Sequence, residues 1–67
     1  MDWRFCKEQF FRMAEELIQK GVIKDVDVRT SPLRIFVYSK KGYPAGFYNW
    51  ESAYEALKLL IDYVEVT

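Results

Sequence analysis

Apolar side chains near the start of the chain recur at steps of three and four residues. This spacing places them on one side of a helix that we expect over residues 3–20. Asp2 suits the N-cap because its carboxylate can accept a hydrogen bond from a free backbone N–H. Gly21 suits the left-handed position that follows a helix. The expected apolar stripe consists of Trp3, Cys6, Phe10, Met13, Ala14 and Leu17.

The pattern changes to alternation in the middle of the chain, which is typical of strands. Valines alternate with charged residues over 22–29, although Lys24 interrupts the apolar side. Residues 33–39, LRIFVYS, are rich in β-branched and aromatic side chains and predict the strongest strand. The segment SKKGY then predicts a hairpin in which Gly42 supplies a positive φ.

Pairing of Ser39 with Tyr43 would fix the register of this hairpin and so decide which side chains share a face. A shift of one residue would exchange the two faces. On one face this register pairs Val37 with Ala45 and Ile35 with Phe47. On the other face it pairs Tyr38 with Pro44, Phe36 with Gly46, and Arg34 with Tyr48.

The last part of the chain returns to helical spacing after Asn49, which we expect to be the N-cap. The elements together predict a two-layer α+β fold with the order α-β-β-β-α, as a single domain over residues 1–67. A three-stranded antiparallel meander packs on two helices in this fold. The sheet face beneath the helices would carry Val26, Val28, Leu33, Ile35, Val37, Ala45 and Phe47, joined by Trp50 and Tyr54 from the second helix.

Three aromatic residues are left on the opposite sheet face, beside Arg34: Phe36, Tyr38 and Tyr48. One interpretation is structural, because a ring that covers a cross-strand glycine stabilises a sheet. The other is that the rings form an apolar patch that binds a partner. Phe5 and Phe11 raise a similar question, since they lie off the helix stripe and either fold back onto the domain or form a helix-mediated dimer contact.

Composition excludes several kinds of chemistry. The chain of 67 residues has one cysteine, Cys6, and no histidine, so it can form neither an intrachain disulfide nor a Ser-His-Asp site. Asp25 and Asp27 share a strand face that we expect to be solvated. Lys40-Lys41-Gly42 lacks the features of a phosphate loop. We therefore expect no catalytic residue, no metal site and no cofactor.

Ten basic and ten acidic residues give a formal charge of zero, which disfavours a nucleic-acid binder. The order helix-strand-strand-strand-helix nevertheless resembles, in topology, the double-stranded-RNA-binding domain. The resemblance implies RNA contacts from the first helix, an inter-strand loop and a basic cluster that opens the last helix. Here that helix opens NWESAYEAL, which is acidic. Single-stranded nucleic acid could instead stack on the outer rings, with Arg34, Lys40 and Lys41 near its backbone.

The sequence thus favours a small non-enzymatic protein-interaction module. We expect it to self-associate as a homodimer, or to bind another protein, through Arg34, Phe36, Tyr38 and Tyr48. Binding of single- or double-stranded nucleic acid is the alternative. The chain shows no apolar run of membrane-spanning length, and its single unpaired cysteine is typical of the cytoplasm.

Overall fold

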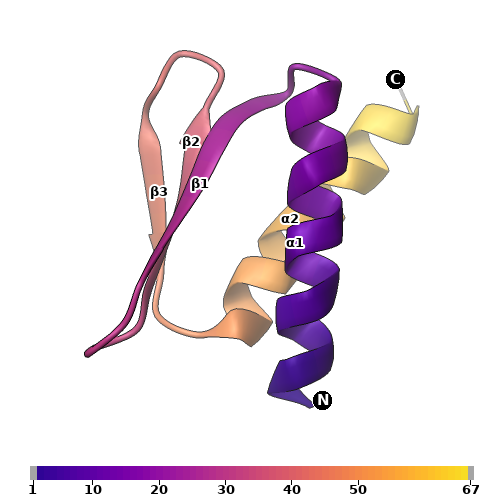
Figure 1. The fold of residues 1–67 in the computed structure, drawn as a ribbon. Coiled ribbons are helices and arrows are strands. Elements are labelled where there is room, and N and C mark those ends of the chain that lie inside the picture. The colour runs from indigo at the N-terminus through magenta and orange to yellow at the C-terminus, as the bar shows by residue number, and fades with distance from the viewer. Residues whose placement is uncertain (1, 67) are drawn as a thin grey trace.

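A computed structural model describes residues 2–66, the last of them by its backbone alone. These residues form five elements in the order α1 (Trp3–Gln19), β1 (Ile23–Arg29), β2 (Arg34–Ser39), β3 (Pro44–Phe47) and α2 (Trp50–Val66) (Figure 1). The predicted α-β-β-β-α order is therefore confirmed.

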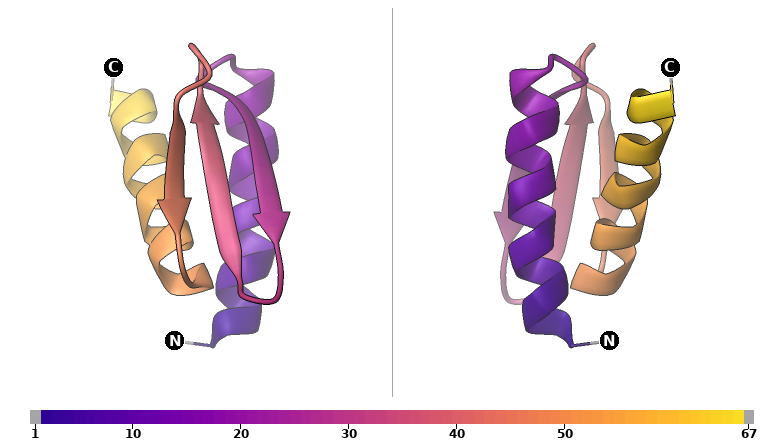
Figure 2. Two further views of the ribbon diagram at one scale, coloured as in Figure 1. Left: turned by 90° about the vertical axis from the view of Figure 1, so that its left-hand side faces the viewer. Right: turned by 90° about the vertical axis from the view of Figure 1, so that its right-hand side faces the viewer.

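The three strands form one antiparallel sheet in which β2 is central. Both helices cover the same face of this sheet, with α1 nearer β1 and α2 nearer β3 (Figure 2). The two helices pack against each other and run in the same direction. Consequently the domain has two layers, and no helix within residues 2–66 covers the second face of the sheet.

Local hydrogen bonds define the start of both helices and the end of α1. Asp2 Oδ1 accepts a hydrogen bond of 3.0 Å from the backbone N–H of Arg4, and Asn49 Oδ1 accepts one of 2.8 Å from that of Ser52. Beyond the C-cap of α1, Gly21 has a φ of +73°. The next N–H, that of Val22, donates to the carbonyl of Leu17 at 2.9 Å, which completes a Schellman motif.

Replacement of Gly21 by alanine tests this helix end. A side chain at positive φ costs about 1–2 kcal/mol, so Gly21→Ala should lower the free energy of unfolding by that amount. Gly46→Ala is the matched control, because Gly46 does not have a positive φ. Urea titrations followed by circular dichroism compare the two variants. Equal losses in both would contradict the role given to Gly21.

The predicted register between β2 and β3 is confirmed. The backbone N–H of Ser39 donates to the carbonyl of Tyr43 at 2.8 Å, and Gly42 in the turn has a φ of +93°. The observed pairs are Ile35 with Phe47, Phe36 with Gly46, Val37 with Ala45, and Tyr38 with Pro44.

The start of β1 differs from strict alternation. Ile23 pairs with Ser39 and Asp25 with Tyr38, so Lys24 is an extra residue in β1. This bulge returns Ile23 to the face beneath the helices, where only 4% of its surface is exposed. Strict alternation therefore fails at Lys24, although Val22 does pack against the core as expected.

The core lies between the sheet and the helix pair. It consists of Cys6, Phe10, Ala14, Leu17, Ile23, Ile35, Val37, Trp50, Ala53 and Leu57. Two residues expected inside are more open: Trp3 is half-exposed in the first turn of α1, and Ala45 is exposed. Ala45 shares the inner face with Val37, but β3 is a four-residue edge strand that α2 covers only thinly.

Phe5 and Phe11 pack within the domain, although each remains partly exposed. The Phe5 ring meets Tyr54 of α2 edge-on, with the centroids 6.0 Å apart. Phe11 lies 5.6 Å from the Trp50 ring, centroid to centroid. The Tyr54 contact agrees with the interpretation that Phe5 lies off the stripe of α1 and folds back onto the domain, because α2 packs beside α1.

Candidate protein-interaction surface

The side chains of the uncovered sheet face form three rows across the strands, which we call the outer sheet face. The pairing of the strands sets each row. The first row is Asp25, Tyr38 and Pro44, the second is Asp27, Phe36 and Gly46, and the third is Arg29 and Arg34, with Tyr48 just after β3. The strand pairing places Arg34, Phe36 and Tyr38 on this face as predicted, and Tyr48, just beyond β3, contacts Arg34.

Phe36 occupies the centre of the outer sheet face and is half-buried. A Cβ atom built on Gly46 would lie 3.4 Å from its ring, so the ring covers the glycine. The guanidinium carbon of Arg29 lies 6.0 Å from the centroid of the same ring. These contacts support the structural interpretation of Phe36, because the ring stabilises the sheet and offers only part of its surface to a partner.

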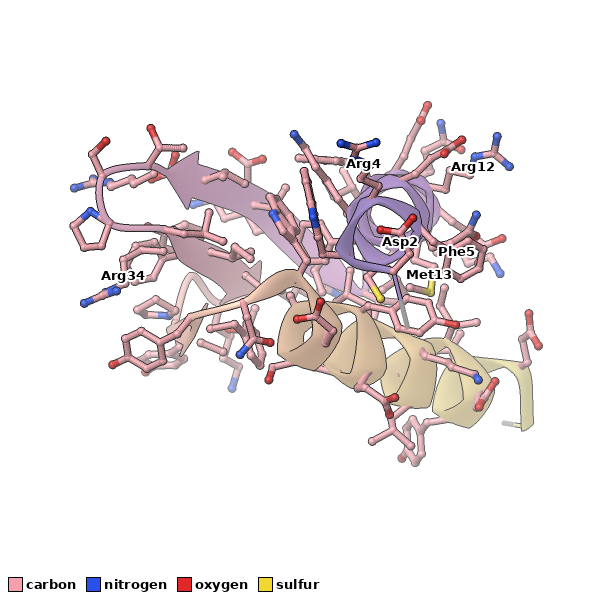
Figure 3. All side chains as sticks on the ribbon, turned by 90° about the horizontal axis from the view of Figure 1, so that it is seen from below. Asp2, Arg4, Phe5, Arg12, Met13 and Arg34 are labelled. Atoms are coloured by element: carbon pink, nitrogen blue, oxygen red, sulfur yellow. The ribbon has the colours of Figure 1, made fainter. Side chains whose placement is uncertain are left out.

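Arg34 and Tyr48 form a closer cation–π contact than Arg29 and Phe36 do on the same face. The guanidinium carbon of Arg34 lies 4.4 Å from the Tyr48 ring centroid, within the range of a cation–π interaction. Arg34 Nη1 also donates to the carbonyl of Leu33 at 3.1 Å. Figure 3 shows Arg34 on the opposite side of the molecule from α1. These contacts orient the Arg34 side chain beside Tyr48, which is 69% exposed.

The charges of the outer sheet face are separated along the strands. Asp25 and Asp27 occupy the first two rows of β1, whereas Arg29 and Arg34 share the third row. Arg29 Nε lies 3.2 Å from a carboxylate oxygen of Asp27. Asp25 Oδ1 accepts a hydrogen bond of 2.8 Å from the backbone N–H of Val26, which occupies a donor of this edge strand.

Residues 2–66 contain neither a pocket nor a group of three or more His, Cys, Asp or Glu side chains that could hold a metal ion. Cys6 of α1 is fully buried in the core. Its burial raises the pKa of the thiol above the ordinary value of 9.0, and the Glu51 carboxylate adds to this shift. The thiol is therefore protonated at neutral pH, which is the unreactive form.

The raised pKa of Cys6 predicts a loss of stability in alkali. The folded state holds the thiol proton more tightly than the unfolded chain, so this contribution is complete below pH 9.0 and is lost as pH rises through the higher pKa. Between about pH 8 and about pH 10, the wild type should lose more unfolding free energy than Cys6→Ala. Guanidinium titrations at both pH values measure this difference, and equal losses would refute it.

Two further apolar side chains are exposed on α2, and the sequence pattern did not single them out. Leu59 and Tyr63 are 69% and 67% exposed and lie one turn apart. They fall outside the side of α2 that packs on the core, which carries Ala53, Leu57 and Ile61. Their spacing of four residues was the available signal, because it places both side chains on one flank of the helix.

The groups expected near a nucleic acid are not gathered together. Lys40 and Lys41 lie in the hairpin turn after β2, whereas Arg34 lies at the other end of the same strand. Asp25 and Asp27 line the neighbouring strand between these ends. At the opening of α2, where the RNA-binding family has its basic cluster, Glu51 stands in the first turn.

Comparisons of this chain with protein-family models, with curated proteins and with solved structures find no match. Among the residues that the structure describes, no helix combines the length and apolar character needed to cross a membrane.

Proposed function

We propose that the protein is a small non-enzymatic interaction module that self-associates as a homodimer through its outer sheet face. One observation carries this proposal: both helices lie on the same side of the sheet, which leaves a three-stranded face with an aromatic centre uncovered. Arg34, Phe36, Tyr38 and Tyr48 supply the contacts. Tyrosine, phenylalanine and arginine are the side chains that interface cores favour.

The size of this face sets the strength of the contact. Three strands spaced by about 4.8 Å, each residue rising about 3.3 Å, give a footprint of roughly 300 Å². Standard interfaces bury about 800 Å² on each partner, so this contact belongs to the weak class. We expect a dissociation constant on the order of 0.1 mM.

Charge favours a protein partner over a nucleic acid. The outer sheet face carries two carboxylates and two guanidinium groups, and the carboxylates lie between the arginine row and the lysines of the hairpin turn. A phosphate backbone laid along the strands would pass over Asp25 and Asp27. A second copy of the domain brings opposite charges to both kinds of group.

Sedimentation velocity over about 0.02 to about 2 mM protein tests the proposal. The weight-average sedimentation coefficient should rise from that of a monomer toward that of a dimer. In parallel, fluorescence anisotropy of labelled single-stranded and double-stranded RNA at low salt should stay flat. A monomer throughout the range would remove self-association. Salt-dependent RNA binding would establish the alternative function instead.

A further inference from the structure

We infer that the two copies pair about a two-fold axis that runs across the strands, so that the arginine row of each copy lies over the Asp25 row of the other. This inference rests on the proposed function and specifies the geometry of the dimer. It follows from how the charged and aromatic side chains are distributed over the outer sheet face.

A face-to-face homodimer has its two-fold axis in the plane between the sheets, and each surface contacts itself. Because stacked sheets align their strands to within about 30°, the axis runs either along the strands or across them. An axis along the strands keeps each row opposite the same row. An axis across the strands exchanges the first row with the third and leaves the second opposite itself.

The axis along β2 places like charges together. It sets Arg34 of one copy against Arg34 of the other, because both lie in the third row of the central strand. It also lays Asp25 over Pro44, where the carboxylate loses water and gains no cation. The attractive contact that this arrangement gains is Arg29 over Tyr48 of the second copy, but that ring already contacts Arg34 of its own chain.

The axis across the strands brings complementary groups together instead. Arg29 then faces Asp25 of the second copy, and Arg34 faces its Tyr38. Tyr48 approaches Pro44 of the second copy, and the two Phe36 rings meet at the centre. Each Asp27 also meets its counterpart.

The meeting of the two Asp27 carboxylates is the unfavourable element of this arrangement. Each carboxylate is already paired with Arg29 of its own chain at 3.2 Å. In the dimer each Arg29 therefore lies between Asp27 of its own chain and Asp25 of the second copy. Opposite charges alternate along the contact, which favours this axis over the other.

Two charge-reversal variants test the inference. Asp25→Arg alone sets arginine against Arg29 of the second copy at both ends of the interface, and Arg29→Asp alone sets aspartate against Asp25. Each variant should dimerise at least tenfold more weakly than the wild type. When the two are mixed, both contacts of the heterodimer join opposite charges. The mixture should return to within about threefold of the wild-type affinity.

Matched controls separate a specific contact from a general effect of charge. Glu8 and Arg12 form an exposed ion pair on α1, and Figure 3 shows Arg12 on the far side of the molecule from Arg34. Glu8→Arg and Arg12→Glu, alone or mixed, should leave the affinity unchanged. If Asp25→Arg fails to fold, Asp25→Asn keeps an acceptor for the Val26 N–H and removes the charge. It should weaken dimerisation about threefold to tenfold.

The outcomes distinguish this inference from the proposed function. A wild type that stays monomeric overturns both. A wild-type dimer that Phe36 and Tyr38 substitutions abolish, but whose charge-reversal variants stay weak when mixed, overturns only the axis. Restoration in the mixture, with unchanged controls, supports the axis across the strands.

Discussion

Replacement of Phe10 by alanine should leave the protein largely unfolded at 25 °C. The Phe10 side chain has no exposed surface, and its ring contacts Phe11 and Trp50 edge-on at centroid distances of 5.4 and 5.6 Å. Removal of a buried phenylalanine costs about 3–5 kcal/mol, because both apolar burial and packing are lost. A single hydrophobic core in a domain of this length supplies only about 3–5 kcal/mol of stability. The substitution therefore removes most of it.

Phe11→Ala is the matched control for this prediction. The Phe11 ring belongs to the same aromatic cluster but is 41% exposed, so its loss should cost only about 1–2 kcal/mol. Urea unfolding followed by tryptophan fluorescence and far-ultraviolet circular dichroism compares both variants with the wild type. A Phe10→Ala variant that unfolds cooperatively with a loss below about 1 kcal/mol would contradict the core described for α1.

The double substitution Phe36→Ser/Tyr38→Ser should abolish self-association up to about 2 mM protein. Both side chains lie on the central strand of the outer sheet face, where truncation of an aromatic contact costs about 2 kcal/mol or more. Two such losses would raise the dissociation constant from about 0.1 mM to well above the highest protein concentration used, about 2 mM. Loss of the Phe36 ring also uncovers Gly46, so the monomer itself should be less stable by about 1 kcal/mol.

Leu59→Ser/Tyr63→Ser provides the control for this loss of association. These two side chains are more exposed than Phe36 and Tyr38, but they lie on α2. The variant should dimerise as the wild type does. Sedimentation is compared at a temperature where circular dichroism shows every variant folded. Loss of the dimer in the α2 variant alone would transfer the interface to the helix layer.

Most of the fold was predictable because its signals are local. Asp2, Gly21 and Asn49 end or begin helices through contacts within a few residues. Gly42 fixes the hairpin, and the hairpin in turn fixes which side chains share the outer sheet face. Such contacts depend on neighbouring residues and not on how the layers pack, so the sequence pattern contains them.

The differences arise where packing between distant elements decides. The bulge at Lys24 allows Ile23 to fill space beneath the helices, and a strictly alternating pattern does not predict this packing. Phe5 becomes part of the domain only because Tyr54 of α2 lies beside it. Ala45 has the predicted face, but the narrow cover that α2 gives to β3 leaves it exposed.

The candidate surface was also predictable only in part. The register predicts which residues belong to it, but it does not predict that Phe36 and Tyr38 are half-buried. The register predicted that Arg34 meets Tyr48, and the two side chains are in contact, although Tyr48 lies in a bend after β3 and not within the strand. The ion pair between Asp27 and Arg29 joins residues two apart on one strand face, so their spacing already indicated it.

A dilution series monitored by amide chemical shifts tests the central claim most directly, because it locates the interface in the unmodified protein. Between about 2 and about 0.05 mM, shifts should change at Asp25, Asp27, Arg29, Arg34, Phe36, Tyr38 and Gly46, while the amides of α1 stay constant. Changes confined to the helices, or none at all, would contradict the account.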